Sequence, residues 1–223
     1  MKAIKPIFEE MAHTLNEINS GIEIVAVTKQ VGIDRTQEAV DAGIRHLGEN
    51  RPEGLKLKHG EIKGDVVWHY IGTLQSRKVK DVIGLIDYLH SLDRMSLAKE
   101  IQKRADQPVN CFIQVNVSGE DSKSGFSPEE VPAVIESLKE FDMVRVVGLM
   151  TMAPNTEDEA LLRATFKGLK ELQQQVAAKK WAHAPCTELS MGMSNDYLIA
   201  AEEGATFVRV GTALVGSESE AER

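Results

Sequence analysis

Residues 22–29 read "IEIVAVTK", an apolar run that ends in a lysine, Lys29. Residues 24–27 are apolar at successive positions, as expected of a strand whose two faces are both covered in a parallel sheet. Together with this run, the apolar runs of the chain number eight: 22–27, 44–48, 66–72, 86–92, 110–117, 144–150, 186–191 and 206–211. The pattern predicts a sheet of eight strands.

Helix-patterned segments separate these runs, and an amphipathic helix precedes the first of them. The clearest segments are 34–43, 94–105, 127–141 and 156–180. In the first helix, apolar residues recur at helical spacing: Ile4, Ile7, Phe8, Met11, Leu15 and Ile18. Eight strand–helix units predict an α/β fold, a TIM-type (β/α)8 barrel, with residues 1–223 as a single domain and the first helix as an extra element closing one end.

The alternative fold is a doubly wound open sheet, and the strand ends favour the barrel. Polar or glycine-containing clusters follow the runs: "TK", "GEN", "IGTLQS", "HSLD", "NVSGE", "LMT", "SMGMS" and "RVGT". In a barrel all these ends meet at one rim, where such folds place their sites. An open sheet would spread half of them away from the site.

Composition narrows the class of protein. The chain is 42% hydrophobic and 27% charged, which is ordinary for a globular protein. A net charge of −8 argues against nucleic-acid binding, which needs clustered Lys and Arg. No apolar window is long enough for a signal peptide or a membrane span. We expect no membrane contact and a cytoplasmic location.

Cysteine usage supports the same location and excludes a metal site of cysteines. Cys111 and Cys186 lie inside apolar stretches, and neither has a partner at metal-ligand spacing. We expect buried free thiols in a reducing compartment. No His, Asp and Glu cluster has metal spacing either, so no metal is expected.

Lys29 is the first candidate for chemistry. At the mouth of a barrel a lysine after an apolar strand is partly desolvated, which favours the neutral amine that attacks an aldehyde to form a Schiff base. The alternative is a strand-end lysine that simply extends to solvent.

The last two strand ends suit an anion. Ser194, in "LSMGMSNDY" (189–197), leaves a strand and opens a helix, where free backbone N–H groups attract phosphate. We expect Ser194 to be both helix N-cap and phosphate ligand; the alternative is capping alone, by Ser194 or Asn195. Gly211 and Thr212 follow the eighth strand, and the loops after strands seven and eight hold phosphate in these barrels.

Arg209 lies within the last strand, between Val208 and Val210. If the valines pack outward against helices, the guanidinium points into the barrel, where a buried charge needs a partner. The alternative is a structural ion pair with an interior carboxylate. A reactive lysine, a phosphate site and an interior arginine together suggest an aldehyde that carries a phosphate, and pyridoxal 5′-phosphate is such a cofactor.

Three further residues have two interpretations each. Glu49 and Asn50, in "GEN", either form a turn or offer ligands at the rim. His69, in "WHYIG", either faces the barrel interior or is an ordinary buried histidine.

Motifs over almost the whole chain resemble one known family. They are "VAVTK" (25–29), "AGIRHLGEN" (42–50), "WHYIGTLQSRK" (68–78), "HSLD" (90–93), "QVNVSGEDSKSGF" (114–126), "GLMTM" (148–152), "ELSMGMSNDY" (188–197) and "VRVGTALVG" (208–216). In these stretches the chain is similar to the pyridoxal phosphate homeostasis proteins, single-domain relatives of the N-terminal barrel of bacterial alanine racemase.

The resemblance implies roles for the candidate residues. Lys29 forms the Schiff base, and Asn50 lies beside the cofactor. The phosphate is held by Ser194, Gly211 and Thr212. Arg209 faces the pyridine nitrogen, and because a guanidinium cannot accept that nitrogen's proton, the ring is left a poor carbanion stabiliser.

The chain also departs from the family pattern. Many members carry a second lysine where this chain has Val31, and many extend past the final motif with an arginine and a tyrosine, whereas this chain reads "LVGSESEAER". Lys123 matches the pattern as another candidate second lysine; the alternative is a solvated loop charge.

We therefore expect a protein that holds pyridoxal phosphate in intracellular vitamin B6 homeostasis, without efficient catalysis. The alternative is a pyridoxal phosphate-dependent amino-acid racemase, which needs a base on each face of the substrate. In alanine racemase the second base comes from a separate β-domain of the partner subunit; this chain ends within a few residues of its eighth predicted strand, so we expect no second base. We expect a monomer, with cofactor-dependent apo-enzymes as candidate partners.

Overall fold

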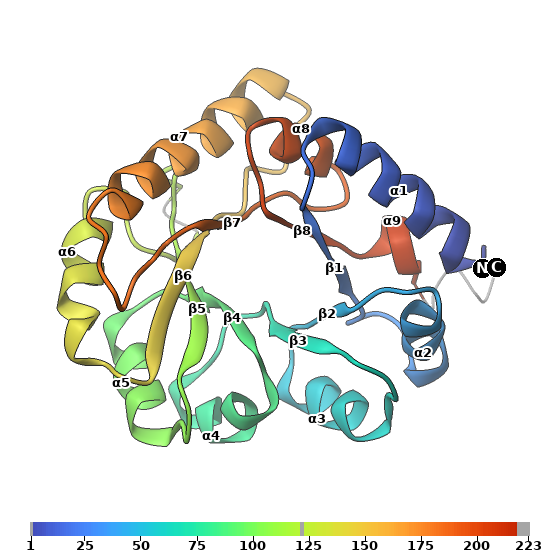
Figure 1. The fold of residues 1–223 in the computed structure, drawn as a ribbon, viewed down its shortest axis with the longest axis horizontal. Helices are drawn as coiled ribbons and strands as arrows, with labels where there is room; N and C mark the ends of the chain where they lie inside the picture. The colour runs from blue at the N-terminus through green and yellow to red at the C-terminus, as the bar shows by residue number, and fades with distance from the viewer. Residues whose placement is uncertain (1, 121–122, 218–223) are drawn as a thin grey trace.

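The structure, a computed structural model, describes residues 2–120 and 123–217 of the chain. Within them, eight parallel strands form one closed barrel in sequence order, and β1 pairs with both β2 and β8 (Figure 1). The strands are β1 (Glu23–Val27), β2 (His46–Glu49), β3 (Val67–Tyr70), β4 (Tyr88–Leu92), β5 (Val109–Gln114), β6 (Val144–Met150), β7 (Glu188–Ser190) and β8 (Phe207–Val210). The predicted barrel is confirmed, and the open sheet is excluded.

Helices form a ring outside the barrel (Figure 1). They are α1 (Ile4–Ile18), α2 (Ile33–Asp41), α3 (Pro52–Glu61), α4 (Val79–Val82), α5 (Met95–Arg104), α6 (Val131–Ser137), α7 (Glu159–Ala177), α8 (Tyr197–Glu202) and α9 (Thr212–Val215), with short 3₁₀ turns at Ser76–Lys78, Ile83–Leu85 and Leu138–Glu140. α7 begins where the Asp158 carboxylate accepts a hydrogen bond from the Leu161 N–H. The segment predicted from residue 127 becomes helical only at Val131, with Pro132 in its first turn.

α1 does not close one end of the barrel, contrary to the sequence-based expectation. It lies in the outer ring beside α8 and α9 (Figure 1). Ile4, Met11 and Leu15 are its buried residues. The Ile4 N–H donates to a Glu38 carboxylate oxygen on α2 at 3.1 Å. The helix therefore extends the apolar layer between helices and sheet, because its apolar stripe is complementary to that layer.

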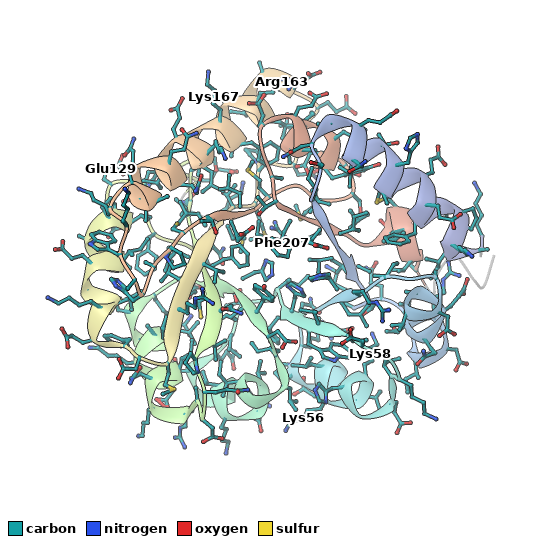
Figure 2. All side chains as sticks on the ribbon, in the orientation of Figure 1. Lys56, Lys58, Glu129, Arg163, Lys167 and Phe207 are labelled. Carbon is teal, nitrogen blue, oxygen red and sulfur yellow. The ribbon has the colours of Figure 1, made fainter. Side chains whose placement is uncertain are left out.

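The alternation of side chains along each strand divides the core into two parts. One part lies between strands and helices and includes Val208 and Val210. A smaller part fills the barrel interior and includes Phe112 and Phe207, and Figure 2 shows Phe207 near the centre while Arg163 and other charged side chains point outward. Arg209, between the two valines, therefore faces the interior, as the sequence pattern predicts.

Cys111 and Cys186 are both buried and free, as expected. Burial raises the pKa of each thiol to about 12. In the described part of the chain, no helix has the length and apolar character of a membrane span, and no cluster of three potential metal ligands occurs.

Candidate functional site

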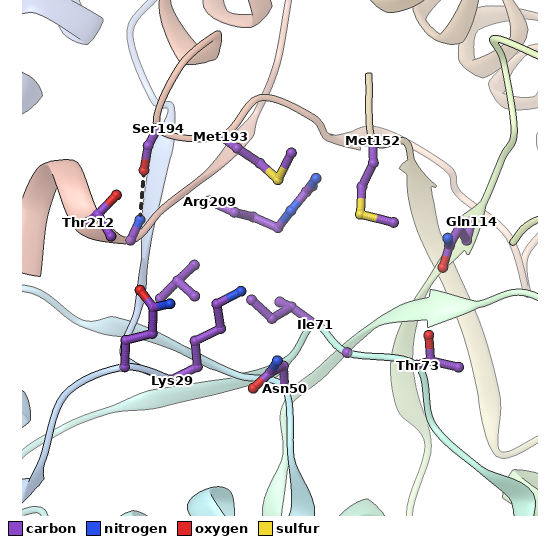
Figure 3. A pocket seen from close by; sticks show the side chains of 14 residues that line it. Lys29, Asn50, Ile71, Thr73, Gln114, Met152, Met193, Ser194, Arg209 and Thr212 are labelled. Carbon is purple, nitrogen blue, oxygen red and sulfur yellow. Dashed lines mark hydrogen bonds between the residues drawn. The ribbon is translucent and has the colours of Figure 1, made fainter. Parts of the chain in front are cut away.

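A pocket of about 390 Å³ lies at the carboxyl ends of the strands, a size typical of small-molecule sites. All six candidate cofactor residues line it: Lys29, Asn50, Ser194, Arg209, Gly211 and Thr212 (Figure 3). These residues come from four loop or strand segments that are far apart in sequence. Barrel closure brings them together.

Lys29 follows β1, and its amine projects into the pocket (Figure 3). The residue is exposed, so the expectation that burial desolvates it is wrong. The preceding residue, Thr28, is fully buried, and its hydroxyl donates to a Glu49 carboxylate oxygen at 2.6 Å. The backbone that carries Lys29 is therefore anchored from behind, while its side chain remains free to reach a ligand.

The anchor includes a buried ion pair that sequence analysis missed. Lys58 on α3 donates to Glu49 at 2.5 Å and to the Thr28 carbonyl at 2.6 Å. Glu49 and Lys58 are 2% and 5% exposed. Glu49 is thus neither a ligand nor a simple turn residue; it neutralises Lys58 behind the pocket. A lysine in a helix is normally solvated, so no sequence signal marks this pair.

Asn50 follows β2, and its position depends on a glycine. A Cβ at Gly72 would lie 2.3 Å from the Asn50 carbonyl oxygen, so only glycine permits this approach of the segments after β2 and β3. The Tyr70 hydroxyl donates to the same carbonyl at 3.2 Å. Burial, with Glu53 and Glu49 nearby, raises the pKa of that hydroxyl to about 12. Asn50 is therefore held through its backbone, which leaves its amide for the pocket.

Ser194 does not cap the helix, contrary to the sequence-based expectation. α8 begins three residues later at Tyr197, and the Asp196 carboxylate accepts from the Met193 N–H at 2.6 Å. Ser194 instead bridges two loops: its Oγ accepts from the Gly211 N–H at 3.2 Å (Figure 3). Because that oxygen already accepts a bond, its own proton is available to an anion.

Arg209 is buried at the floor of the pocket, 5% exposed. Its Nη1 donates to the Ser190 hydroxyl at 2.5 Å, and its Nη2 donates to the Thr151 carbonyl at 3.0 Å. No carboxylate of the described residues forms an ion pair with it, so the alternative of an interior ion pair is wrong for this part of the chain. Burial, opposed by Asp196, lowers its pKa to about 10, which leaves the guanidinium charged at neutral pH.

Lys123 lies at the border of the pocket. It pairs with Glu120 and donates to the Met152 carbonyl at 3.3 Å. Met152 lines the pocket, whereas Lys123 does not. The side chain is one-fifth exposed, so it is not a freely solvated loop charge. Val31, at the position where the family often has lysine, is 5% exposed in the core.

Among the described residues, the pocket lining carries two cations and no carboxylate, in a chain whose net charge is −8. Sequence analysis missed several of its members, because they lie in loops without a distinctive pattern: Ile71, Thr73, Gln114, Met152 and Met193. A primary amine, three hydroxyls and a guanidinium around one cavity are suited to a small anion that also carries an aldehyde. The donor set therefore fits a phosphorylated aldehyde.

Comparison with known proteins first defines the class. Residues 8–219 match the family model described as the alanine racemase N-terminal domain. Alanine racemase from Corynebacterium glutamicum superposes with a TM-score of 0.72 at 13% identity, covering 94% of this chain and 60% of that one. The protein is therefore an alanine racemase N-terminal-type barrel.

Closer relatives define the family. The pyridoxal phosphate homeostasis protein of Aquifex aeolicus is 40% identical over 198 residues, covering 87% of this chain and 86% of the relative. That of Pseudomonas aeruginosa is 36% identical over 212 residues, covering 93% and 90%. The chain belongs to the pyridoxal phosphate homeostasis protein family, which confirms the sequence resemblance.

Solved structures include a protein of the same size. PipY of Synechococcus elongatus PCC7942 without PLP superposes with a TM-score of 0.88 at 31% identity, covering 96% of this chain and all of that one. PipY with PLP bound gives 0.81 at 33% identity, covering 94% and 100%. One relative of the same fold thus holds pyridoxal phosphate.

Proposed function

We propose that this protein binds pyridoxal 5′-phosphate in the pocket at the carboxyl ends of the strands and contributes to intracellular vitamin B6 homeostasis. The observation that carries the proposal is the lining: the Lys29 amine, the Arg209 guanidinium and the Ser194 and Thr212 hydroxyls meet around one cavity, and no carboxylate from residues 2–120 or 123–217 lines it. Family membership and the PLP-bound structure of PipY support the same ligand.

Each residue has a proposed task. The Lys29 nitrogen attacks the aldehyde carbon; a C=N bond replaces the C=O bond, and the oxygen leaves as water. The Ser194 and Thr212 hydroxyls donate hydrogen bonds to the phosphate, which lies beside Gly211. Asn50 and Arg209 line the same pocket (Figure 3); Asn50 would contact the ring, and Arg209 would face the pyridine nitrogen. When bound, the cofactor supplies an aldehyde that reacts with amines and a ring that accepts electrons.

The same residues argue for storage rather than turnover. Arg209 can only donate hydrogen bonds, so it cannot hold a proton on the pyridine nitrogen. Racemisation needs a base on each face of the substrate, and the described lining residues offer Lys29 and Arg209 as their titratable groups. His69 is fully buried and does not line the pocket. We propose a cytoplasmic monomer that keeps the reactive aldehyde bound and releases it to cofactor-dependent apo-enzymes.

Reduction with borohydride tests the attachment. The purified protein is incubated with pyridoxal phosphate, reduced, digested and analysed by mass spectrometry. We expect the pyridoxyl group on Lys29, and no adduct in Lys29→Ala. Lys58→Met is not a suitable control because Lys58 anchors the site; Lys56→Met, in an exposed pair on the same helix, should label like the unmodified chain. An adduct that maps mainly to Lys78 or Lys123 would refute the assignment.

A further inference from the structure

Below the pocket, a continuous row of polar side chains crosses the barrel interior. Each neighbouring pair is within hydrogen-bond distance except the last, which is a longer contact. The row runs Arg209 Nη1 to Ser190 Oγ (2.5 Å), Ser190 Oγ to His90 Nδ1 (2.7 Å), His90 Nε2 to His69 Nδ1 (2.8 Å), His69 Nε2 to His46 Nδ1 (2.9 Å) and His46 Nε2 to Glu23 Oε2 (3.3 Å). We call these six residues the interior chain. It joins the pocket to Glu23, whose side chain is 52% exposed at the start of β1.

The interior chain is enclosed by aromatic rings. His69 stacks on Tyr88 with ring centroids 4.8 Å apart, and His90 stacks on Phe112 at 4.4 Å. Phe207 lies edge-on to His90. His69 and His90 are fully buried, so water cannot replace a hydrogen bond that either ring loses, and the loss is costly.

The first member of the interior chain favours one direction for all of its hydrogen bonds. A guanidinium only donates, so the Ser190 oxygen accepts from Arg209. His90 Nδ1, 2.7 Å away, is the acceptor within reach of the Ser190 proton, and accepting it leaves the proton of His90 on Nε2, facing His69. The same step repeats at the next ring.

His69 and His46 follow the same pattern. His69 accepts at Nδ1 and carries its proton on Nε2, which it donates to His46 Nδ1. The proton of His46 therefore lies on Nε2 and faces Glu23, a carboxylate that only accepts. With this direction, all three rings are neutral Nε2–H tautomers, with one proton in each contact and every donor oriented from the pocket toward Glu23.

Burial and the charges around the interior chain favour neutral histidine rings. Burial lowers the pKa of His69 and of His90 well below the usual range, and Arg209 adds to the effect on His90. Burial also lowers the pKa of His46, although Glu23 and Asp87 oppose it. Tyr88, the other titratable group against His69, has a raised pKa and stays neutral.

We propose that Ser190, His90, His69 and His46 are positioning residues for Arg209, and that through them the protonation of His46 at the opposite end of the barrel weakens binding in the pocket. The second half of this proposal rests on the proposed function, because it takes pyridoxal phosphate as the ligand.

Protonation of His46 must reverse the donor and acceptor roles in the hydrogen bonds of the interior chain from His46 to Ser190. A proton on His46 Nδ1 removes the acceptor for His69, so the protons of His69 and His90 move to Nδ1 and the added charge stays on His46. His90 then donates to the Ser190 oxygen, which already accepts from Arg209. The Ser190 proton then has no acceptor, and the Ser190 oxygen accepts from both Arg209 and His90. The guanidinium is consequently held less firmly.

The first test needs no ligand. Long-range ¹H–¹⁵N correlation spectra of the protein without cofactor, labelled on histidine and assigned with single variants, report which ring nitrogen is protonated. At pH 7.5 we expect Nε2–H tautomers at His46, His69 and His90. An Nδ1–H tautomer at any of the three would overturn the proposal, whatever the pocket binds.

The second test compares the affinity for pyridoxal phosphate at pH 7.5 and pH 5.5 in matched variants. His46→Asn places an amide oxygen near the Nδ1 position, so it still accepts from His69 but does not titrate. We expect the affinity of the unmodified protein to fall by roughly fivefold more than that of His46→Asn over this range. His13→Asn, at an exposed histidine paired with Glu17, should behave like the unmodified protein.

The outcomes separate the two proposals. Identical pH profiles for His46→Asn and the unmodified protein would overturn the coupling through the interior chain. Failure of every variant to bind pyridoxal phosphate at either pH would refute the proposed function instead. The tautomer spectra would still decide whether the hydrogen bonds of the interior chain have the direction described.

Discussion

At the scale of single residues, the buried pair of Glu49 and Lys58 is the feature with the largest expected energetic effect. Neither charge has water as an alternative partner, and both touch Thr28, the residue before Lys29. Lys58→Met would leave a buried carboxylate without its cation. Lys56, on the same helix, points to solvent (Figure 2) and provides the contrast.

We expect Lys58→Met to lower the free energy of unfolding by about 3–5 kcal/mol, because breaking one side of a buried pair leaves an uncompensated charge. Urea unfolding followed by circular dichroism measures the change. Lys56→Met should have little effect, since exposed pairs contribute little. Equal effects of the two variants would show that Glu49 finds another partner.

The phosphate ligands are a second residue-scale prediction. Ser194→Ala and Thr212→Val each remove one hydroxyl donor, and a hydrogen bond to a charged group contributes about 1.5–3 kcal/mol, or roughly ten- to a hundredfold in affinity. Equilibrium dialysis against pyridoxal phosphate measures the loss, with unfolding curves as the control for folding. Unchanged retention in the double variant would place the phosphate elsewhere.

At the scale of elements, the pocket depends on how closely the segments after neighbouring strands approach. Gly72, after β3, touches the carbonyl of Asn50, after β2, and Gly192, after β7, has a φ of +91° with no room for a Cβ against Ala200. These contacts set the positions of Asn50 and of the loop that carries Ser194. The first joins the segments after two neighbouring strands, and the second packs the turn after β7 against α8, the helix that follows it.

Gly72→Ala tests this dependence. Its Cβ would lie 2.3 Å from the Asn50 carbonyl oxygen, so the two segments must separate, and overpacking of this kind costs about 1–3 kcal/mol of stability. We also expect weaker retention of pyridoxal phosphate. Gly60→Ala, on α3 where an added Cβ meets no atom within 4 Å, is the matched control and should keep both properties. Wild-type retention in Gly72→Ala would remove Asn50 from the proposed site.

At the scale of the whole molecule, we expect negligible turnover of free amino acids. Arg209 cannot accept a hydrogen bond from a protonated pyridine nitrogen, and the described pocket lining has no second base beside Lys29. The measurement is chiral analysis of D- and L-alanine after prolonged incubation with a stoichiometric amount of cofactor-loaded protein. Multiple turnovers that disappear in Lys29→Ala would make the protein a racemase.

The sequence by itself determined the barrel and the rim that carries the pocket. Eight apolar runs, each followed by a polar or glycine-containing cluster, are enough to predict parallel strands whose carboxyl ends converge. Lys29, Asn50, Gly211 and Thr212 could be predicted as neighbours for that reason. Arg209 could be placed inside because side chains alternate along a strand and its flanking valines are apolar.

Only the tertiary structure decided which side chains meet. His90 and Ser190 are 100 residues apart in sequence, and their 2.7 Å contact exists because the barrel closes with a particular register. The pairing of Lys58 with Glu49 and the use of Ser194 as a bridge to Gly211, rather than as a helix cap, have the same origin. Local patterns report whether a residue is buried and which way a strand runs, whereas a specific hydrogen bond requires two positions to be fixed in space by everything packed around them.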